Sequence, residues 1–553
     1  MNAQRTSSRR NTARYGDFRL IALALGLGLS LGPAASAYAQ TPAAEQPTAA
    51  PAAASPAPTE AAAPAVPPGR IRVPYLSETE KKRIRDELRQ EILDTARREN
   101  WAQPEAVPEW IKRVKLSADL MVRGEAQMYD RGNSTAFVNF QAVNSGAPVR
   151  FDGNSRDTLP VLNTTEDRRL LRLRSRVGLD LTISPELTMG LRLATGNAVS
   201  PVSTNQTLGN DFNKLNLLLD RAYMRYQPQP TLAVNLGRMA NPYGGALDLV
   251  WDRDVSFDGL SLQWTPTWLG SQWRLTPGLF SVENTDPNFP GNSLVKSSSY
   301  DKWLAALQLE WSRSLGAGRS LRGAAAYYDF LNSDGQLSSD CDTVSDKVPC
   351  DTDNSRPGFL QKGNTVFAIR QPKFGTPGVE NYQYFGLVSK FQVLDVAAGF
   401  EMPLSGPLHL NIDAEFARNL AFDRQHFESL RTRVFNNLVG CAKDDAACQS
   451  NPPLDVGNDA YQAQVRVGYP VVRNRGDWQS HFGYRYVESD AVLDAFTDSD
   501  FHLGGSNAKG YYLGGSVGFA TNAAISLRYL SATEVSGPPL AIDLLQIDVS
   551  LNF

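Results

Sequence analysis

From residue 116 to the end of the chain, apolar and polar side chains alternate with a period of two. In Leu116–Tyr129 the even positions are apolar or small, and most odd positions are polar, including Asp119, Arg123 and Glu125. Successive side chains of a strand point to opposite faces, so this segment predicts a β-strand with one apolar and one charged face. The alternation returns at 168–183, 408–414, 461–469, 478–486 and 525–529.

Short and long spacers alternate between these segments, as in outer-membrane barrels with short periplasmic turns and long outer loops. The short spacers lie at 184–185, 227–230, 316–318, 405–407 and 521–522, and the long ones at 130–167, 197–213, 240–256, 331–380 and 419–458. Strand centres are predicted near residues 122, 175, 191, 220, 235, 261, 276, 306, 325, 397, 413, 465, 482, 514, 527 and 547. Tyr382–Phe391 is interpreted as loop, or as an extension of the tenth strand, because a further strand would reverse the sides of all later loops.

The resulting fold class is all-β: a 16-stranded antiparallel transmembrane β-barrel over residues 116–553, with a short N-terminal helix. An even, closed number of strands is expected because an open edge would leave backbone groups unpaired in lipid. Sixteen strands enclose an aqueous channel.

Three segments precede the barrel. Residues 1–39 combine a basic start, an apolar run and the small-residue pattern Ala37-Tyr38-Ala39, which is typical of a secretory signal peptide. Residues 40–75 are rich in Ala and Pro and predict an extended periplasmic spacer. Residues 76–101 begin with the capping box Ser77-Glu78-Thr79-Glu80 and predict an amphipathic helix. It is either a lone helix or a short coiled coil that helps subunits to trimerise.

Composition narrows the class of protein. The chain has 553 residues, a net charge of -3 and four Cys, and its mean hydropathy is -0.32. These values exclude a strongly basic nucleic-acid-coating protein, a helical transporter and a disulfide-dense miniprotein. They leave a membrane β-barrel open, because alternation hides the apolar content of its strands.

Aromatic residues gather near the ends of the predicted strands, as interfacial girdles require. They are Trp264, Trp268, Trp273, Trp303, Trp311 and Trp478. The last strand alternates Leu545, Ile547, Val549, Leu551 and Phe553. This ending resembles the terminal strand by which outer-membrane barrels are recognised for assembly, so Val549, Leu551 and Phe553 are the expected assembly signal and the barrel-assembly machinery an expected partner.

Several motifs resemble the bacterial outer-membrane putative porin family. They are Gly237-Arg238-Met239-Ala240-Asn241-Pro242-Tyr243, Asp248-Leu249-Val250-Trp251-Asp252-Arg253-Asp254, Phe257-Asp258-Gly259-Leu260, Arg72-Val73-Pro74-Tyr75, and Trp110-Ile111-Lys112-Arg113 before the first strand. The resemblance implies a sixteen-strand-type porin in the bacterial cell outer membrane and leaves the transported solute open. The Ala/Pro-rich spacer departs from the family pattern.

The charged face of the strands is the candidate functional surface. Rings of Arg and Lys favour anions in a pore, and the alternative is a balanced, hydrated wall that sets no selectivity. The predicted pore-lining residues are Arg123, Arg172, Arg174, Arg176, Arg192, Arg221, Arg225, Arg322, Arg466, Arg485, Arg528, Asp119, Glu125, Asp180, Glu310, Asp413, Glu415 and Asp548.

The cysteines predict two local disulfides, Cys341–Cys350 and Cys441–Cys448, each within one outer loop of an exported protein. A zinc site would need Cys-x-x-Cys spacing, which is missing. His409 and His481 are expected in the lumen, but no Ser/His/Asp arrangement accompanies them, so an enzyme is not expected. No metal or cofactor is expected either.

The function predicted from the sequence is passive diffusion of small hydrophilic solutes, with a weak anion preference, through a homotrimeric porin in outer-membrane lipid. The constriction is expected from either the 240–256 segment or the Cys341–Cys350 loop. The alternative is a surface-exposed adhesin or envelope-tethering barrel with a plugged pore.

Overall fold

The chain forms two units, Met1–Thr95 and Ala96–Phe553. A computed structural model describes residues 109–553 except 151–158, 246, 292, 345–347, 374–380 and 440–444, together with some residues between 80 and 91. The predicted signal peptide and spacer therefore lie outside the described residues.

In the first unit, the described residues between 80 and 91 are helical and exposed. They fall within the predicted helix of 76–101, the rest of which is not described. Arg83 Nε lies 3.5 Å from Glu87 Oε1, one helical turn away. Such an exposed pair adds only a few tenths of a kcal/mol to helix stability, about 0.2–0.5.

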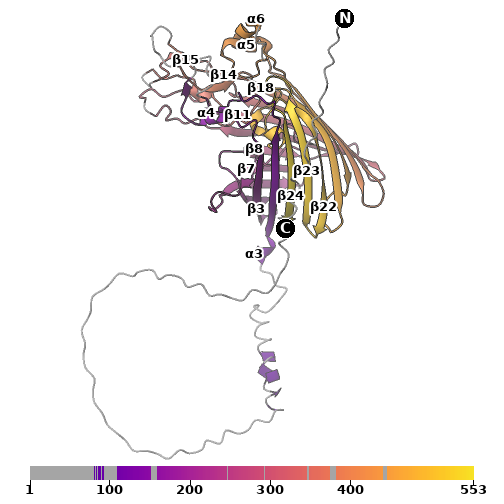
Figure 1. Ribbon diagram of the computed structural model, residues 1–553. Helices are drawn as coiled ribbons and strands as arrows, with labels where there is room; N and C mark the ends of the chain where they lie inside the picture. The colour runs from indigo at the N-terminus through magenta and orange to yellow at the C-terminus, as the bar shows by residue number, and fades with distance from the viewer. Residues whose placement is uncertain are drawn as a thin grey trace, which may run out of the picture. The chain divides into compact units, whose positions relative to one another are not determined.

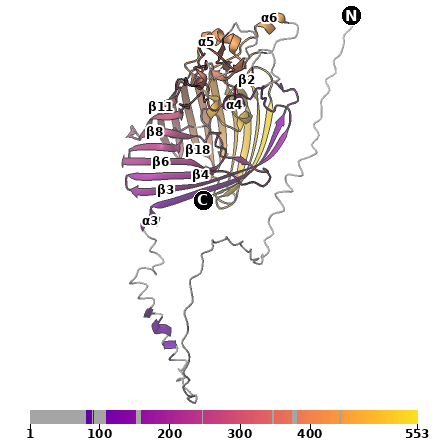
Figure 2. The same ribbon diagram turned by 90° about the vertical axis from the view of Figure 1, so that its left-hand side faces the viewer.

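The second unit is a closed antiparallel β-barrel (Figures 1 and 2). Its sheet has 18 strands, of which β5 (Gln206–Thr207) and β9 (Thr267–Trp268) contain two residues each, so that sixteen form the wall. These are β1 (Val114–Tyr129), β3 (Arg168–Ser184), β4 (Leu187–Thr195), β6 (Leu217–Gln229), β7 (Leu232–Ala240), β8 (Ser256–Trp264), β10 (Ser271–Glu283), β11 (Lys302–Gly316), β12 (Arg319–Leu331), β18 (Phe391–Pro403), β19 (His409–Asn419), β20 (Asp459–Gly468), β21 (Trp478–Val487), β22 (Ala508–Ala520), β23 (Ala523–Glu534) and β24 (Ile542–Asn552). Every predicted strand centre lies inside one of them, so the predicted fold class is confirmed.

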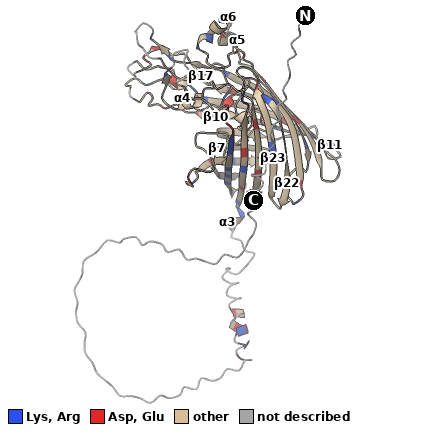
Figure 3. Ribbon diagram, viewed as in Figure 1, with Lys and Arg blue, Asp and Glu red and all other residues tan. Residues whose placement is uncertain are grey.

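The barrel closes where the first strand meets the last. β1 pairs with both β3 and β24, and the β24 register places Val122 opposite Val549 and Arg123 opposite Asp548. Directly opposed residues share a face. The predicted alternation is therefore kept across the seam, with apolar residues on the outside and charged residues on the inside. Figure 3 shows charged residues at intervals along the mostly uncharged strands.

Aromatic side chains mark the two ends of the outer surface. Trp268, Trp273 and Trp311 lie in contact at the end with short turns, with ring centroids 6.4 Å apart in each pair. Toward the long loops, Tyr461 stacks on Tyr486 with centroids 4.9 Å apart. Amphipathic rings at two levels are typical of the two interfaces of a membrane.

The long loops carry their own short elements. Small sheets form between β2 (Val149–Arg150) and β16 (Tyr382–Gln383), β13 (Asp340–Cys341) and β15 (Gln371–Pro372), and β14 (Val366–Ala368) and β17 (Phe385–Leu387). The segment 382–391 thus stays out of the barrel wall until β18 begins, as predicted. The helices and 3₁₀ turns are α3 (Glu109–Lys112), α4 (Phe140–Ser145), α5 (Arg424–Ser429), α6 (Ala446–Ser450), η1 (Asp353–Ser355), η2 (Arg431–Arg433), η3 (Asp494–Phe496) and η4 (Phe501–Leu503). Among the described residues, no helix has the length and apolar character needed to cross a membrane.

Candidate functional site

The loop between β7 and β8, residues 241–255, folds into the barrel and is called the inward loop below. Its backbone is held by strands that are not adjacent to β7 or β8: Gly244 N donates to Gln308 Oε1 on β11 (2.8 Å), and Leu247 N donates to Glu415 Oε2 on β19 (3.1 Å). Because β19 is not adjacent to β7 or β8 in the wall, the loop lies across the interior.

Apolar packing holds one side of the inward loop. Leu249 and Val250 are buried, and Trp251 contacts Phe257 and Tyr328 with ring centroids 4.8 and 5.3 Å away. These rings belong to one buried cluster that extends along the inner face of β8, β10, β11 and β12. The cluster fills that side of the lumen. It also holds the loop in one position, because packed aromatic pairs stabilise the contact beyond the burial of apolar area.

A carboxylate holds the other side of the loop. Asp248 accepts hydrogen bonds from Arg485 on β21 and from Gln462 on β20, the latter at 3.2 Å. Burial raises the pKa of Asp248, but Arg485 and Arg253 outweigh it and hold that pKa below its ordinary value. Asp248 is therefore an anion that ties the loop to the opposite wall.

The predicted pore-lining residues Arg172, Arg174 and Arg176 form a ladder on the inner face of β3, and each is ion-paired. Arg172 Nη1 is 3.3 Å from Glu125 Oε2, while Arg174 and Arg176 both donate to Asp119, at 3.0 and 2.6 Å. Arg176 also reaches Asp254 of the inward loop at 3.0 Å. The ladder therefore joins β1, β3 and the inward loop in one charged network.

A second network surrounds Arg123, and the sequence reasoning missed two of its members. Arg123 pairs with Asp548 at 2.7 Å and with Asp500 at 3.0 Å, and Arg528 pairs with Asp500 at 3.2 Å. Asp498 lies 3.4 Å from Arg485. Asp498 and Asp500 come from the loop between β21 and β22, and no periodicity in that loop signals that it turns inward.

The other predicted pore-lining residues also have polar partners on the inner face. These are Arg192 with Asp220, Arg221 with Ser256 (3.3 Å), Arg225 with Asn235 (3.2 Å), Asp180 with Tyr223 (3.3 Å), Glu310 with Arg274 (3.2 Å), Asp413 with Arg322 and Arg466, and Glu415 with Leu247 N. Arg274 was not among the predicted residues, although its alternation with Leu275 is a usable signal.

The paired charges are not equally exposed. The Arg322 side chain is 45% exposed, whereas the carboxylate of its partner Asp413 is 1% exposed. The same inequality holds for Arg172 at 22% against Glu125 at 1%. Exceptions are Arg123, Arg485 and Lys302, which are more buried than Asp548, Asp248 and Glu283, respectively. Where the acid is buried beneath its arginine, water in the lumen meets the cation.

The outer loops interlock above the barrel. Lys362 Nζ donates to the carbonyls of His502 (2.5 Å) and Gly504 (2.8 Å), and Asn364 Nδ2 donates to the carbonyls of Ser489 and Val492. Burial lowers the pKa of Lys362 to about 8 and raises the pKa of Asp494, beside Asn364, to about 7. The loop before β18 and the loop before β22 therefore form one clamp, called the outer clamp below.

One of the two predicted disulfides is fully described. Cys341 and Cys350 are bonded, with Cα atoms 5.1 Å apart. Cys448 is also in a disulfide, while its predicted partner Cys441 lies outside the described residues. In the same outer loop, after Cys350, Asp353 is buried in an ion pair with Arg370.

A family model described as putative porin matches residues 32–553. No curated protein sequence matches the chain. Similar solved structures include the outer membrane channel DcaP of Acinetobacter baumannii (10% identity, covering 80% of this chain and 98% of that chain, TM-score 0.37), OprB of Pseudomonas putida (10%, 82% and 97%, 0.42) and OmpF of Salmonella typhi (9%, 80% and 97%, 0.36).

Proposed function

Because this chain belongs to the putative porin family, we propose that it passes small hydrophilic solutes by passive diffusion, with a mild preference for anions. Family membership makes the protein a porin of the bacterial outer membrane. The same membership supports a channel rather than an enzyme. The solute class, the anion preference and the residues that set it are the proposed part.

The unequal exposure of the inner ion pairs is the observation that supports the anion preference. A pair such as Arg172 with Glu125 is neutral overall, but a permeating ion interacts most strongly with the charge nearest to it. At Arg172 on β3 and at Arg322 on β12 that charge is a guanidinium. Fixed cations in a pore wall favour anions. The preference is mild because the paired acids lie within a few ångströms of the arginines.

The inward loop supplies the proposed constriction. It crosses the lumen and is fixed at both sides by the contacts of Trp251 and Asp248. The two constriction candidates from the sequence were this segment and the Cys341–Cys350 loop, and only the former has contacts with the inner faces of β11, β19 and β21 among the described residues.

The proposed assembly is a homotrimer in outer-membrane lipid, inserted by the barrel-assembly machinery. Two features support the lipid location and the insertion route: an apolar outer surface closed into a barrel, and a chain that ends in Leu551 and Phe553. Neither feature selects a subunit number, so the mass of the purified protein in detergent is the measurement that checks this part.

Single-channel conductance of the refolded mature protein, in planar bilayers under a salt gradient, tests the proposed function. We expect stepwise conductance and a reversal potential on the anion-selective side. A correctly folded, heat-modifiable barrel that never conducts would contradict the channel and favour an adhesin or tether whose lumen is plugged by its loops.

Replacing Arg172, Arg174 and Arg176 with Gln tests the ladder. The reversal potential should move toward cation preference, because Asp119, Glu125 and Asp254 then lose their paired cations. Arg418→Gln is the matched control, since Arg418 pairs with Asp459 on the outer surface at the long-loop end. An unchanged reversal potential in the triple variant would show that the ladder does not set selectivity.

A further inference from the structure

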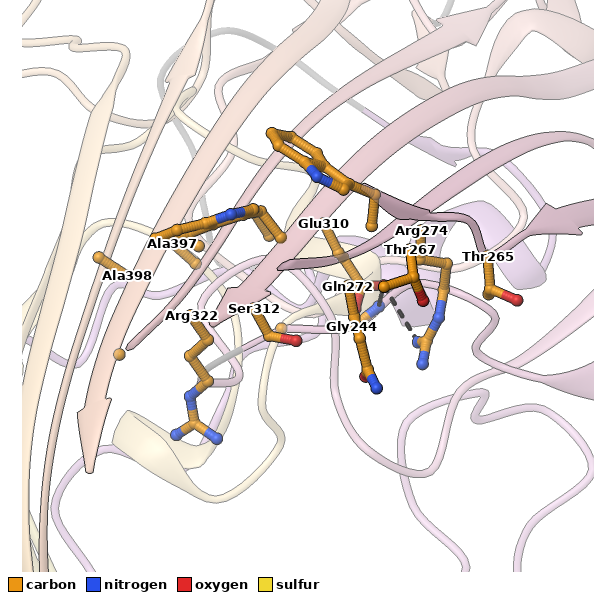
Figure 4. Close-up of a pocket in the computed structure, with 16 residues that line it drawn as sticks. Gly244, Thr265, Thr267, Gln272, Arg274, Glu310, Ser312, Arg322, Ala397 and Ala398 are labelled. Atoms are coloured by element: carbon orange, nitrogen blue, oxygen red, sulfur yellow. Dashed lines mark hydrogen bonds and ion pairs between the residues drawn. The ribbon is translucent and has the colours of Figure 1, made fainter. Parts of the chain in front are cut away.

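A recess in the inner wall lies next to the inward loop and has a volume of about 420 Å³ (Figure 4). It is bordered by β10, β11, β12 and β18 and by Gly244 and Gly245 of the inward loop. A volume of this size suits a small organic solute, since ligand sites range from about 300 to 1,000 Å³.

Small residues create the recess. Ala324, Ala397 and Gly399 lie on the inner face of β12 and β18, where neighbouring strands carry large side chains. A Cβ on Gly399 would lie 2.3 Å from Arg322 Nε and 2.7 Å from Asp413 Oδ1. The missing side chain therefore lets Arg322 lie across β18 toward Asp413, and its guanidinium forms one side of the recess.

Hydrogen-bond donors surround the floor of the recess, which is formed by Ala324, Ala397 and Gly399. In Figure 4, Arg322 and Arg274 stand at opposite sides of the recess, with Ser312 and Gln272 between them. Both guanidiniums are almost half exposed, at 45% and 44%. Their acids are less accessible: Asp413 is buried, and Glu310 Oε1 accepts hydrogen bonds from both Arg274 (3.2 Å) and Gly244 N (3.1 Å). The exposed charge in the recess is therefore positive on both sides.

We propose that this recess is a binding site for a small monocarboxylate that also carries hydroxyl groups, such as a sugar acid. Arg322 or Arg274 pairs with the carboxylate, because a guanidinium matches it with two parallel N–H donors. Ser312, Gln272 and the other arginine bind hydroxyls, and the C–H face of the solute lies on Ala324 and Ala397. The inference rests on the proposed function and deepens it, because it gives the pore a resting site for one solute class.

Interruption of the open-channel current by added gluconate is the first test. Gluconate should shorten the periods of open-channel current in a concentration-dependent way. Glucose, which is similar in size but uncharged, should need at least about a tenfold higher concentration for the same interruption. Equal interruption by both solutes would overturn the proposal, since it would mean simple crowding of the pore.

Two variants separate charge from shape. Arg322→Gln removes one cation, and Ala324→Leu fills the floor without changing charge. Each should raise the half-blocking gluconate concentration at least tenfold, whereas Arg418→Gln, on the outer surface, should leave it unchanged. Ala397→Leu provides a second filling variant if Ala324→Leu fails to give a heat-modifiable barrel. Unaltered gluconate block in Arg322→Gln and in a folded filling variant would refute the site.

Failure of the channel and failure of the site are distinguishable. A silent parent protein contradicts the proposed function before gluconate is added. Calorimetric titration of gluconate into the detergent-solubilised full chain then still decides the site: heat of binding that Arg322→Gln and Ala324→Leu abolish supports it, and no binding overturns it.

Discussion

Asp413 is one buried acid shared by two exposed cations. Arg322 and Arg466 both pair with it, on the inner face of β12 and β20, and its carboxylate is 1% exposed. Removing one partner of a buried pair leaves the other charges uncompensated. The local field in the lumen therefore depends on a residue that a permeating solute does not touch.

Asp413→Asn should increase anion selectivity and lower stability. The two arginines keep their charge and lose their counter-ion, so the reversal potential should move further to the anion side. The loss of unfolding free energy should be about 1–2 kcal/mol, below the 3–5 kcal/mol of fully buried pairs because both guanidiniums reach water. Reversal potential and urea midpoint measure the two effects. A shift toward cations would contradict the assigned inner face.

Asp494 should make the outer clamp sensitive to pH. Burial raises its pKa to about 7, so the folded clamp holds the proton more tightly than the unfolded loop does. Its contribution to stability is then fully present below about pH 4 and is lost as pH rises through about 7. Lys362, whose pKa is lowered to about 8, stays charged over most of this window.

Asp494→Asn should reduce this pH dependence, and a smaller part should remain because burial also raises the pKa of Asp490, which accepts hydrogen bonds from Thr365, to about 6. A shift of about three pKa units corresponds to at most about 4 kcal/mol, and relaxation of the loop reduces that figure. Amide hydrogen exchange of residues 361–365 and 489–506, compared at pH 5 and pH 7.5, is the measurement. In the parent protein exchange should accelerate at pH 7.5 beyond its chemical rate, and in the variant this acceleration should be smaller. The same acceleration in both proteins would assign the effect to another group.

At the scale of elements, the strands were predictable because two solvents act on them. Lipid outside and water inside impose alternation on every strand, and a one-residue slip would turn Arg172, Arg174 and Arg176 outward at about 2–4 kcal/mol each near the midplane. That constraint is written into the local sequence. It explains why all sixteen strand centres and the loop assignment of 382–391 were correct.

The loops could not be predicted in the same way. Asp248, Asp498 and Asp500 reach the lumen because their loops turn inward, and the partners that hold them lie on distant strands. Trp251 is part of a recognisable motif, yet its buried position depends on packing against Phe257 and Tyr328. The recess was harder still to predict from the sequence. It exists because Ala324 and Gly399 have small side chains or none, and sequence periodicity does not indicate which small residues leave space.

Trp251→Ala should loosen the inward loop. The truncation leaves a cavity among Phe257, Tyr328 and Phe496, and losses of about 3–5 kcal/mol are typical of such changes in a core. We expect larger and noisier single-channel currents with the barrel intact. Trp268→Ala, at the exposed outer surface, is the control. Quiet currents of unchanged size in the Trp251 variant would mean that the loop is fixed by Asp248 and its backbone contacts alone.

At the scale of the whole molecule, the barrel depends on its last strand. Phe553 exchanges two backbone hydrogen bonds with Ala118, at 3.1 and 2.8 Å, and the β24 register runs from there to Tyr129. Deleting Leu551–Phe553 should lower the amount of heat-modifiable barrel in outer membranes several-fold, because an open edge is costly in lipid. Deleting Ser536–Gly537 from the last outer loop is the control. Equal yields of folded barrel would contradict a role of these residues in closure.

The pairing of β1 with β24 also determines when the barrel can close during assembly. Every other pairing between long strands joins neighbours along the chain, so each forms by closing a comparatively short stretch, whereas this one joins residues more than four hundred positions apart. The entropic cost of closing a loop grows only with the logarithm of its length. The closing of the barrel is therefore delayed mainly because β24 is the last strand to be made, and less because of its separation from β1 in the sequence. The first strand must wait, with one edge unsatisfied, until the last has been exported. During that interval the nascent barrel is an open sheet with unpaired edges. A strand of another chain can then pair with the free edge of β1.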